Sequence, residues 1–237
     1  MTNISRYHKN QYKQIYNSTI EFIKFIKKNV SLKNKIILDI GCGAGANTIF
    51  LAKHYPSSNI IGVDHNNNLI KYASGQKKKE KLSNCKFVVS GIKDLSLKVI
   101  KEKKVDIILS FHFLSFTNEW ITRNLKKILS LKPKYIAHSS LFYNGEVDAK
   151  ILIDDFSKSE FKGSYYNIFS IPKIKTFLKN KNFTNFKFET MKVKKFLKKP
   201  KHTGMNSYTI DLKNKKKLLF SGPLFLPHGF FYSKNNL

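Results

Sequence analysis

Short apolar runs alternate with segments of helical period over the first 140 residues of the chain. The runs have the length and composition of buried strands, and the segments between them repeat apolar residues at spacings of three and four, as amphipathic helices do. This alternation predicts a parallel sheet whose crossover connections are right-handed. The predicted strands cover 35–40, 59–63, 86–90, 105–110 and 134–140, and the predicted helices cover about 8–30, 47–54, 67–75 and 118–131, the last with Trp120 on its core face.

The pattern changes after residue 140. The segment 141–170 has no clean period and is rich in Tyr, Asn and Asp, and long irregular segments of this kind are usually functional. A helix is predicted over 172–181, followed by an alternating strand over 183–196 whose expected partners are 207–212 and 217–220. The aromatic tail up to Tyr232 is expected to be packed core, a dimer contact or a pocket wall.

A glycine turn joins the first strand to the first helix after it. The turn reads Gly41-Cys42-Gly43-Ala44-Gly45, and an acid, Asp39, lies inside the strand just before it. Glycine lets the backbone pass close to a ligand, and the start of a helix offers unpaired N–H groups and a partial positive charge. An acid at this place suits a ligand that carries positive charge.

The stretch from Leu38 to Gly45 resembles motif I of the class I methyltransferases that depend on S-adenosylmethionine (SAM). In that motif an apolar strand, an acid and one apolar residue precede Gly-x-Gly-x-Gly. The resemblance covers about the first 140 residues. It implies SAM as co-substrate, no metal, and Asp39 close to the methionine ammonium. It also implies an α/β, Rossmann-like fold with a seven-stranded, mostly parallel sheet, helices on both faces and an antiparallel C-terminal edge.

The resemblance further implies a domain plan and a set of residues around the cofactor. A single domain over 1–237 is expected, with a helical cap (1–33), a SAM-binding core (34–140), a substrate-side insertion (141–170) and a C-terminal helix with antiparallel strands (171–237). The expected cofactor-binding residues are Asp39, Gly41, Cys42, Gly43, Gly45, Asn47, Asp64, His65, Gly91, Ile92, Ser110 and Phe111.

A dinucleotide site is the rival interpretation, because Gly41, Gly43 and Ala46 also satisfy the G-x-G-x-x-G/A pattern. A pyrophosphate above the strand would be repelled by Asp39, so SAM is favoured over a nicotinamide cofactor. Asp64 ends the second strand, where both folds hold the ribose hydroxyls, although such a residue can also be a helix cap.

The adenine side departs from the family pattern. Gly91 stands where the family often has an acid, so the backbone near Gly91 and the side chain of Ile92 are expected to contact the adenine. Asp94 is expected to begin a helix instead.

The acceptor side offers one histidine and several hydrogen-bonding residues. His112 follows the fourth strand and is a candidate general base, or else a hydrogen-bonding residue that moves no proton. Tyr143, Asn144 and Tyr166 in the insertion are further catalytic candidates that suit a small polar acceptor. No Asp/Asn-Pro-Pro-Tyr/Phe tetrapeptide occurs, which argues against methylation of amino groups on adenine, cytosine or glutamine.

The net charge of +29 has two interpretations. Nearly all the basic residues are lysine, with only Arg6 and Arg123 as arginine, and they are spread along the whole chain. A solvated surface, which includes the run Lys77–Lys81 as a loop, is favoured over an RNA or other polyanionic substrate. Nucleic acid is therefore a less favoured partner than a small molecule.

Cysteines and apolar stretches indicate a cytoplasmic protein. Two cysteines, Cys42 and Cys85, are too few for a disulfide scaffold or a zinc site, and both are expected to be reduced. The first ten residues lack the apolar core of a signal peptide, and the longest apolar stretch, 218–232, is interrupted by two prolines, so no membrane association is expected.

The expected function is methylation of an oxygen or nitrogen atom on a small molecule, by a monomer or homodimer. Three alternatives stay open. The enzyme could use the aminocarboxypropyl arm of SAM, by transfer or by cyclisation with release of methylthioadenosine. It could methylate RNA, or it could bind SAM without catalysis.

Overall fold

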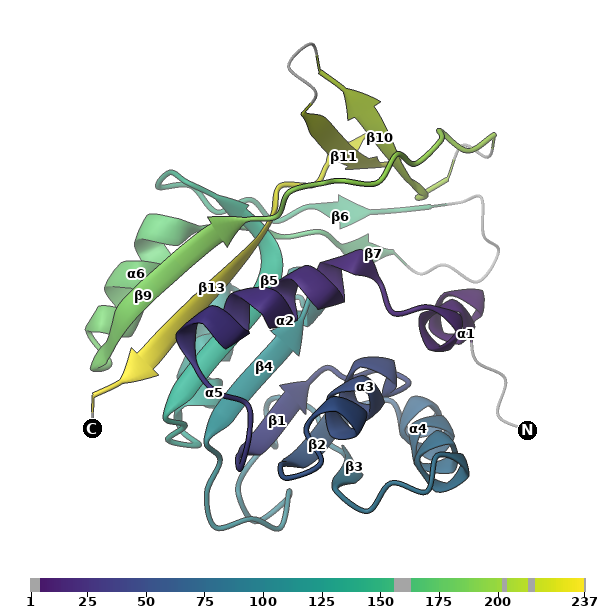
Figure 1. Cartoon of the computed structure of the whole chain (residues 1–237). Helices are drawn as coiled ribbons and strands as arrows, with labels where there is room; N and C mark the ends of the chain where they lie inside the picture. The colour runs from purple at the N-terminus through teal and green to yellow at the C-terminus, as the bar shows by residue number, and fades with distance from the viewer. Residues whose placement is uncertain (1–4, 156–162, 202–203, 213–215, 237) are drawn as a thin grey trace.

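A mostly parallel sheet runs through the centre of the chain, whose computed structural model describes residues 5–155, 163–201, 204–212 and 216–236 (Figure 1). Its strand order is β3-β2-β1-β4-β5-β13-β9, and β8 lies alongside the end of β5. Strands β1 to β5 and β8 are parallel, whereas β13 is antiparallel to both of its neighbours. The strands are β1 (Ile36–Ile40), β2 (Asn59–Asp64), β3 (Cys85–Val89), β4 (Ile107–Phe111), β5 (Tyr135–Tyr143), β8 (Ile168–Ser170), β9 (Phe183–Thr190) and β13 (His228–Asn235).

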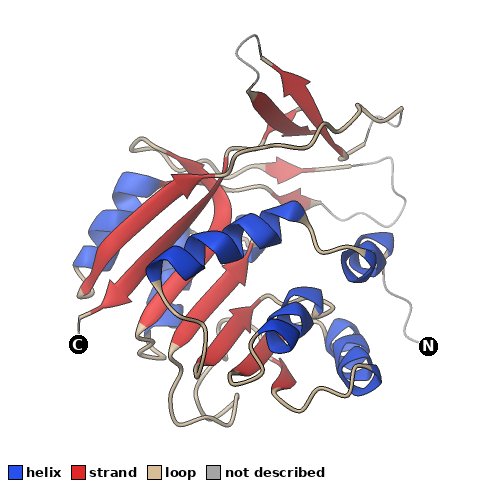
Figure 2. Cartoon of the chain, viewed as in Figure 1, coloured by secondary structure: helices blue, strands red, loops and turns tan. Residues whose placement is uncertain are grey.

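Helices cover both faces of this sheet (Figure 2). On one face, α2 and α3 enclose an apolar cluster in which Phe22 stacks on Phe230 with ring centroids 5.3 Å apart. On the other face, α5 and α6 enclose a second cluster around Phe231. The predicted Rossmann-like α/β fold is confirmed, with β8 as an additional strand. The helices are α1 (Arg6–Lys13), α2 (Asn17–Asn29), α3 (Ala46–His54), α4 (Asn67–Lys79), the 3₁₀ turn η1 (Phe113–Phe116), α5 (Ile121–Leu129) and α6 (Ile171–Lys179).

The predicted helix over 8–30 is wrong as one element, because the chain is extended at Gln14 and Tyr16 and forms two helices. The residues after this break, Asn17-Ser18-Thr19, are weak helix formers, which makes a break there inexpensive. The break lets α1 turn across the glycine turn, where the Tyr12 hydroxyl donates to the carbonyl of Ala44.

Three other local expectations are also wrong. Trp120 precedes α5 and is 42% exposed, because the buried side of α5 is formed by Ile121, Leu125 and Ile128. The lysines 77–79 form the last turn of α4 rather than a loop, and they suit the negative end of the helix dipole. No helix begins at Asp94, whose N–H closes a turn onto the carbonyl of Gly91.

The C-terminal strand pairing differs from the prediction. The partner of β9 is β13, which contains the aromatic tail, while the two predicted partners pair with each other. They form a separate small sheet of β10 (Ser207–Asp211), β11 (Lys217–Ser221) and β12 (Leu224–Phe225). Both faces of β13 are buried, so Phe230, Phe231 and Tyr232 follow one another without the alternation of a half-exposed strand.

The insertion 141–170 begins as a continuation of β5 and ends with β8 in the central sheet. Between them a short hairpin pairs β6 (Leu152–Ile153) with β7 (Ser164–Tyr165). Residues 156–162 of this segment lie outside the described part of the chain. Within the described residues, none of the helices combines the length and the hydropathy needed to cross a bilayer.

Replacing Phe231 by alanine tests the role of β13 in the core. The Phe231 ring is fully buried, stacks on Phe186 at 5.6 Å and meets Phe142 edge-on at 5.7 Å. The expected loss in free energy of unfolding is about 3–5 kcal/mol, because a large cavity is left behind. Urea denaturation followed by circular dichroism measures it. Phe196→Ala removes a ring that is 60% exposed and serves as the control, with an expected change below about 1 kcal/mol.

Candidate functional site

The glycine turn follows β1 and leads into α3. Gly41, Gly43 and Gly45 all have positive φ angles, of 71°, 54° and 88°. A Cβ atom at Gly41 would lie 2.1 Å from the ring of Phe113, and one at Gly45 would lie 2.7 Å from Phe87, so a side chain is excluded at both places. The N–H groups of Gly41 and Cys42 donate to the carbonyl of Val63 at 2.8 and 3.0 Å, which ties the turn to β2.

Asp39 is a buried carboxylate directly below this turn. Its Oδ2 accepts a hydrogen bond from Thr48 Oγ1 at 2.6 Å, while its Oδ1 is buried and has no hydrogen-bond partner in the described chain. Burial is the main cause that raises the pKa of Asp39 to about 7, and the nearby charge of Asp64 acts in the same direction. A cationic group beside Oδ1 would satisfy the free oxygen and favour the ionised form.

Asp64 stands at the end of β2 and faces the same turn. Its Oδ2 accepts the N–H of Gly43 at 2.9 Å and its Oδ1 accepts the N–H of Asn66 at 2.9 Å. The exposed His65 ring brings its Nδ1 within 3.4 Å of Oδ1. The cap of α4 is Asn66, whose side chain accepts the N–H groups of the first turn, so Asp64 is not the cap. Each Asp64 oxygen keeps lone-pair capacity for a further donor.

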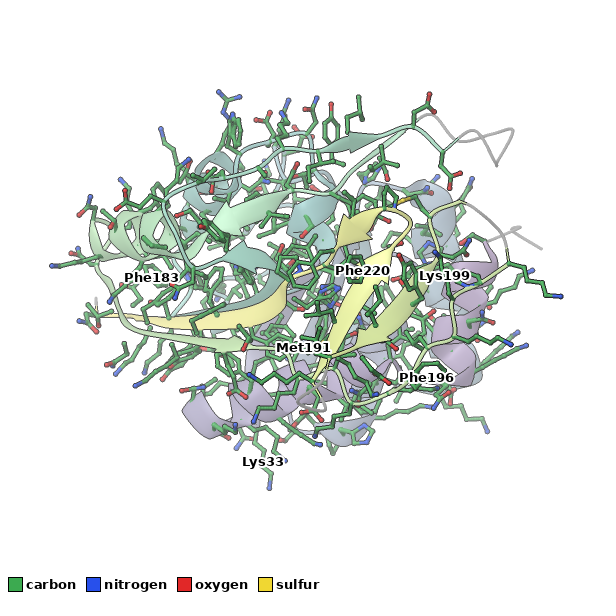
Figure 3. The ribbon with its side chains drawn as sticks, turned by 90° about the horizontal axis from the view of Figure 1, so that it is seen from above. Lys33, Phe183, Met191, Phe196, Lys199 and Phe220 are labelled. Carbon is green, nitrogen blue, oxygen red and sulfur yellow. The ribbon has the colours of Figure 1, made fainter. Side chains whose placement is uncertain are left out.

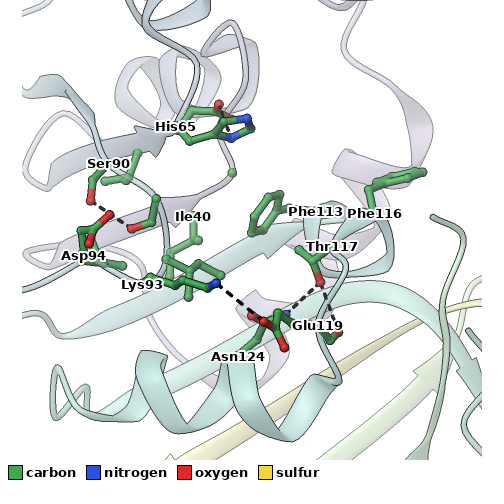
Figure 4. Close-up of a pocket in the computed structure, with 16 residues that line it drawn as sticks. Ile40, His65, Ser90, Lys93, Asp94, Phe113, Phe116, Thr117, Glu119 and Asn124 are labelled. Carbon is green, nitrogen blue, oxygen red and sulfur yellow. Dashed lines mark hydrogen bonds and ion pairs between the residues drawn. The ribbon is translucent and has the colours of Figure 1, made fainter. Parts of the chain in front are cut away.

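A cavity of about 340 Å³ opens in front of Asp64 (Figure 4). Gly91 and Ile92 line it as expected, and so does Asp94, which the sequence interpretation had assigned to a helix. Asp94 Oδ2 would lie 3.8 Å from a Cβ atom at Gly91, so the turn after β3 brings a carboxylate to the side of the cavity where no acid was expected. The sequence carries no signal for it, because type I turns favour Asp at the first position and Gly at the fourth, the reverse of Gly91 and Asp94.

The opposite wall of the cavity comes from the segment after β4. Phe113, Phe116, Thr117, Glu119 and Asn124 contribute to it. In Figure 4 the ammonium of Lys93 points toward Glu119, from which it is separated by 3.9 Å. Buried Asn124 donates to Thr117 Oγ1 at 2.9 Å. These interactions stabilise the wall, and neither of them involves the carboxylate of Asp64 or Asp94.

His112 follows β4 in a left-handed conformation, with φ of 62°. Its Nε2 lies 2.9 Å from Ser139 Oγ, and its ring meets that of His228 edge-on with centroids 4.6 Å apart. Burial lowers the pKa of His112 to about 4 and also lowers the pKa of His228, so both imidazoles are neutral near pH 7. Ser139 and His228 were not expected near His112, because they belong to strands whose pairing the sequence does not specify.

Three further predicted cofactor residues do not line the cavity; they are Ser110, Phe111 and Asn47. Ser110 is fully buried and its hydroxyl has no partner among the described residues, whereas Phe111 points to the α2 face and packs edge-on against Phe22 at 5.1 Å. Asn47 accepts a hydrogen bond from Thr19 at 3.0 Å, and this joins α2 to α3.

The acceptor candidates are not brought together. Tyr166 meets Phe116 edge-on at 5.1 Å and thus stands beside the cavity wall. Tyr143 and Asn144 are exposed at the end of β5 and do not line the cavity. Among the described residues, no three His, Cys, Asp or Glu side chains converge as metal ligands would. The two cysteines form no disulfide.

Helix α1 lies over the glycine turn and was not expected to contribute named residues. A Cβ atom at Gly43 would lie 3.1 Å from the His8 ring, and Tyr12 binds the carbonyl of Ala44. Burial lowers the pKa of His8, whose Nδ1 is buried without a partner in the described chain. The helix therefore closes the turn from the side opposite to β2.

Comparison with known proteins finds similarity to methyltransferases. Residues 31–141 match the family model described as a methyltransferase domain. A putative methyltransferase 235L of Invertebrate iridescent virus 6 is 32% identical over 112 residues, which are 47% of this chain and 37% of that protein. A tRNA (guanine-N(7)-)-methyltransferase of Campylobacter jejuni (strain RM1221) is 27% identical over 171 residues, which are 70% of this chain and 42% of that protein. The chain thus spans less than half the length of these relatives.

A solved structure shows the same fold over nearly the whole chain. Magnesium protoporphyrin IX methyltransferase from Synechocystis PCC 6803, with bound SAH, superposes with a TM-score of 0.60 at 12% identity and covers 99% of this chain and 89% of that one. Residues 31–141 thus match a methyltransferase domain, as the resemblance implied, and after residue 141 the likeness is one of fold alone.

The buried Asp39 carboxylate predicts how stability depends on pH. An acid whose pKa is raised in the folded state, here from 3.8 to about 7, binds more protons folded than unfolded, so the free energy of unfolding falls as pH rises through this window. Asp39→Asn should remove this loss, which is on the order of 2–4 kcal/mol and complete above pH 7. Thermal unfolding of the ligand-free protein between pH 5 and pH 8 measures it. Asp154→Asn, which changes an exposed carboxylate, is the control. If the stability of wild type and that of Asp39→Asn changed with pH in the same way, Asp39 would not have a raised pKa.

Proposed function

We propose that the chain, whose residues 31–141 form a methyltransferase domain of the class I fold, transfers a methyl group from SAM to a small acceptor. The observation that carries this proposal is the free, buried Oδ1 of Asp39 beneath a turn of three glycines. An unpaired carboxylate oxygen at a ligand site favours a cationic partner, and SAM carries both an ammonium and a sulfonium.

The residues present fit SAM in charge and in hydrogen bonding. Asp39 would accept the methionine ammonium, and Asp64 would accept the ribose hydroxyls with the lone pairs that Gly43 and Asn66 leave free. Ile92 would contact the adenine, with Asp94 available to its amino group. We retain Gly41, Cys42, Gly43, Gly45, Asn47, His65, Gly91, Ser110 and Phe111 as proposed neighbours of the cofactor.

SAM supplies a methyl group that its sulfonium already activates, so the protein needs mainly to align the acceptor and exclude water. Phe113 and Phe116 give the site apolar walls, and α1 covers the glycine turn. His112 is neutral near pH 7, and its low pKa makes it too weak a base to take a proton from an ammonium or an ordinary hydroxyl. We therefore propose it as a hydrogen-bonding residue for the acceptor, which moves no proton.

A small-molecule acceptor, methylated on oxygen or nitrogen, is the form of the proposal that we favour. Tyr166 beside Phe116 offers a hydroxyl and a ring where an acceptor would enter. Tyr143 and Asn144 would act only at the outer rim, because both are exposed. Free cysteines support a reducing, cytoplasmic setting. Methylation of RNA is the second candidate, since a tRNA methyltransferase matches 70% of this chain.

The nucleoside product distinguishes these reactions. Purified protein incubated with SAM and a cell extract should release S-adenosylhomocysteine, identified by mass spectrometry, and nothing should form from SAM alone. Methylthioadenosine from SAM alone would instead mean attack on the aminocarboxypropyl arm. SAM binding without any product would contradict an enzymatic role.

Asp64→Ala tests the cofactor position. The variant should bind SAM more weakly by about 1–3 kcal/mol, because charge-assisted hydrogen bonds are lost. Isothermal titration calorimetry measures the affinity, and thermal unfolding checks that the variant is folded. Asp154→Ala, which removes an exposed carboxylate outside the cavity, should bind like wild type. Equal affinity for Asp64→Ala and wild type would mean that the ribose lies elsewhere.

A further inference from the structure

The small sheet β10-β11-β12 stands apart from the central sheet and takes no part in the proposed reaction (Figure 1). No other helix or strand in the described chain packs extensively against it. It is held by a few polar contacts. The N–H of Met205 donates to Asp155 Oδ2 at 2.9 Å, and Leu197 exchanges backbone and side-chain hydrogen bonds with Thr209 along the edge of β10.

One face of this sheet carries a row of aromatic rings. Tyr208 lies opposite Phe220, and Phe220 lies opposite Phe225, so strand pairing places the three on the same face. Tyr208 and Phe220 are stacked with centroids 5.6 Å apart, and Phe220 is 5.7 Å from Phe225, which is 44% exposed. Ile210 and Leu218 are paired with each other and extend the same face. Soluble proteins seldom leave such a face uncovered.

Lysines surround this face at an unusual density. The segment 192–201 alone has six lysines in ten residues and no acid. In the described part of 191–225 the one acid, Asp211, is paired with Lys217 at 2.5 Å, and Lys194 is paired with Glu21 at 3.5 Å. The other lysines of 192–201 have no carboxylate partner within the described residues; they are Lys192, Lys195, Lys198, Lys199 and Lys201.

The ammonium groups and the rings lie close together. Lys199 Nζ is 5.4 Å from the centroid of Tyr208, and Lys217 Nζ is 5.9 Å from that of Phe196, a ring that is 60% exposed. Figure 3, which looks down on the small sheet, shows Phe220 over the strands with Lys199 and Phe196 to one side. A binding partner would therefore meet positive charge and aromatic surface at the same place.

We propose that the small sheet and the segment 192–201 form a binding surface for single-stranded nucleic acid. Lysines neutralise phosphates, and aromatic rings on a sheet stack with unpaired bases, so the two features together match this ligand. An acidic protein or an anionic membrane would also meet the lysines, but rings aligned in register across three strands are the arrangement on which successive unpaired bases stack.

The surface is connected to the candidate active site. The side chain of Tyr166 lies close to that of Ser221 at the end of β11, and its ring contacts Phe116 in the cavity wall. A strand bound on the small sheet would thus lie near the entrance of the cavity. The proposal concerns binding alone and does not rest on the proposed reaction.

Fluorescence anisotropy of a fluorescein-labelled 12-nucleotide oligouridylate, without SAM, tests the proposal. The charge-reversal variant Lys195→Glu/Lys198→Glu/Lys199→Glu changes three exposed lysines of the segment. The control Lys71→Glu/Lys78→Glu/Lys79→Glu changes three exposed lysines on α4 and alters the net charge equally. Phe225→Leu tests stacking. Circular dichroism and thermal unfolding confirm that each variant is folded.

The first variant should lose about tenfold or more in affinity and lower the slope of log K against log salt by about 2, since single-strand contacts contribute about 0.7 each. Phe225→Leu should lose about fivefold or more. The α4 control should change affinity by less than about threefold.

Three results would overturn the proposal. Equal losses in both lysine variants would show that only the overall charge matters. If Phe225→Leu bound the oligouridylate as tightly as wild type, base stacking on this face would make no contribution. Binding to vesicles of phosphatidylglycerol and phosphatidylcholine, with none to the oligouridylate, would assign the surface to a membrane. The matching oligothymidylate distinguishes RNA from DNA, and binding to either supports the proposal.

Discussion

Among the described residues, the carboxylate of Asp39 has one side-chain hydrogen bond, from Thr48, and the strand that holds it leads directly into Ile40 and Gly41, which line the cavity. Because one of its oxygens has no partner in the described chain, the ligand-free protein keeps an unfavourable group at its centre, and a cationic ligand would remove the penalty. Gly41, the first of the three glycines, and Asp64, the second carboxylate, both line the cavity beside Asp39. A cationic ligand that binds beside Asp39 would therefore stabilise the folded protein.

The elements around the cavity differ in how firmly they are held. β1 and β2 are paired over their whole length, and the glycine turn is tied to Val63 by two backbone hydrogen bonds. Helix α1, in contrast, is separated from α2 by an extended segment and contacts the glycine turn through His8 and Tyr12. A bound cofactor would thus contact firmly paired strands on one side and a helix held by few contacts on the other. Movement of α1 would let the cofactor enter and leave.

Local patterns were sufficient to predict the parallel half of the fold, α6 and β9, but not how the strands after β5 pair. The first five strands, the glycine turn and Asp64 follow from apolar runs and turn residues that are close in sequence. Pairing of β13 between β5 and β9 depends on contacts between residues distant in sequence, and a strand buried on both faces has no alternation to reveal it. The approach of His228 to His112 depends on that pairing, and Trp120 was misplaced because the register of α5 is set by tertiary packing.

The position of β13 has a consequence for how the chain acquires its structure during synthesis. This strand is formed by residues 228–235, far from β5 in sequence, yet it separates β5 from β9 and fills both apolar clusters through Phe230 and Phe231. On the ribosome, the half that contains Asp39 and Asp64 can pair its strands early, whereas β9 has no neighbour in the central sheet until β13 has been made. A nascent chain would therefore expose the edge of β5 to chaperones, or to other chains, until β13 emerges.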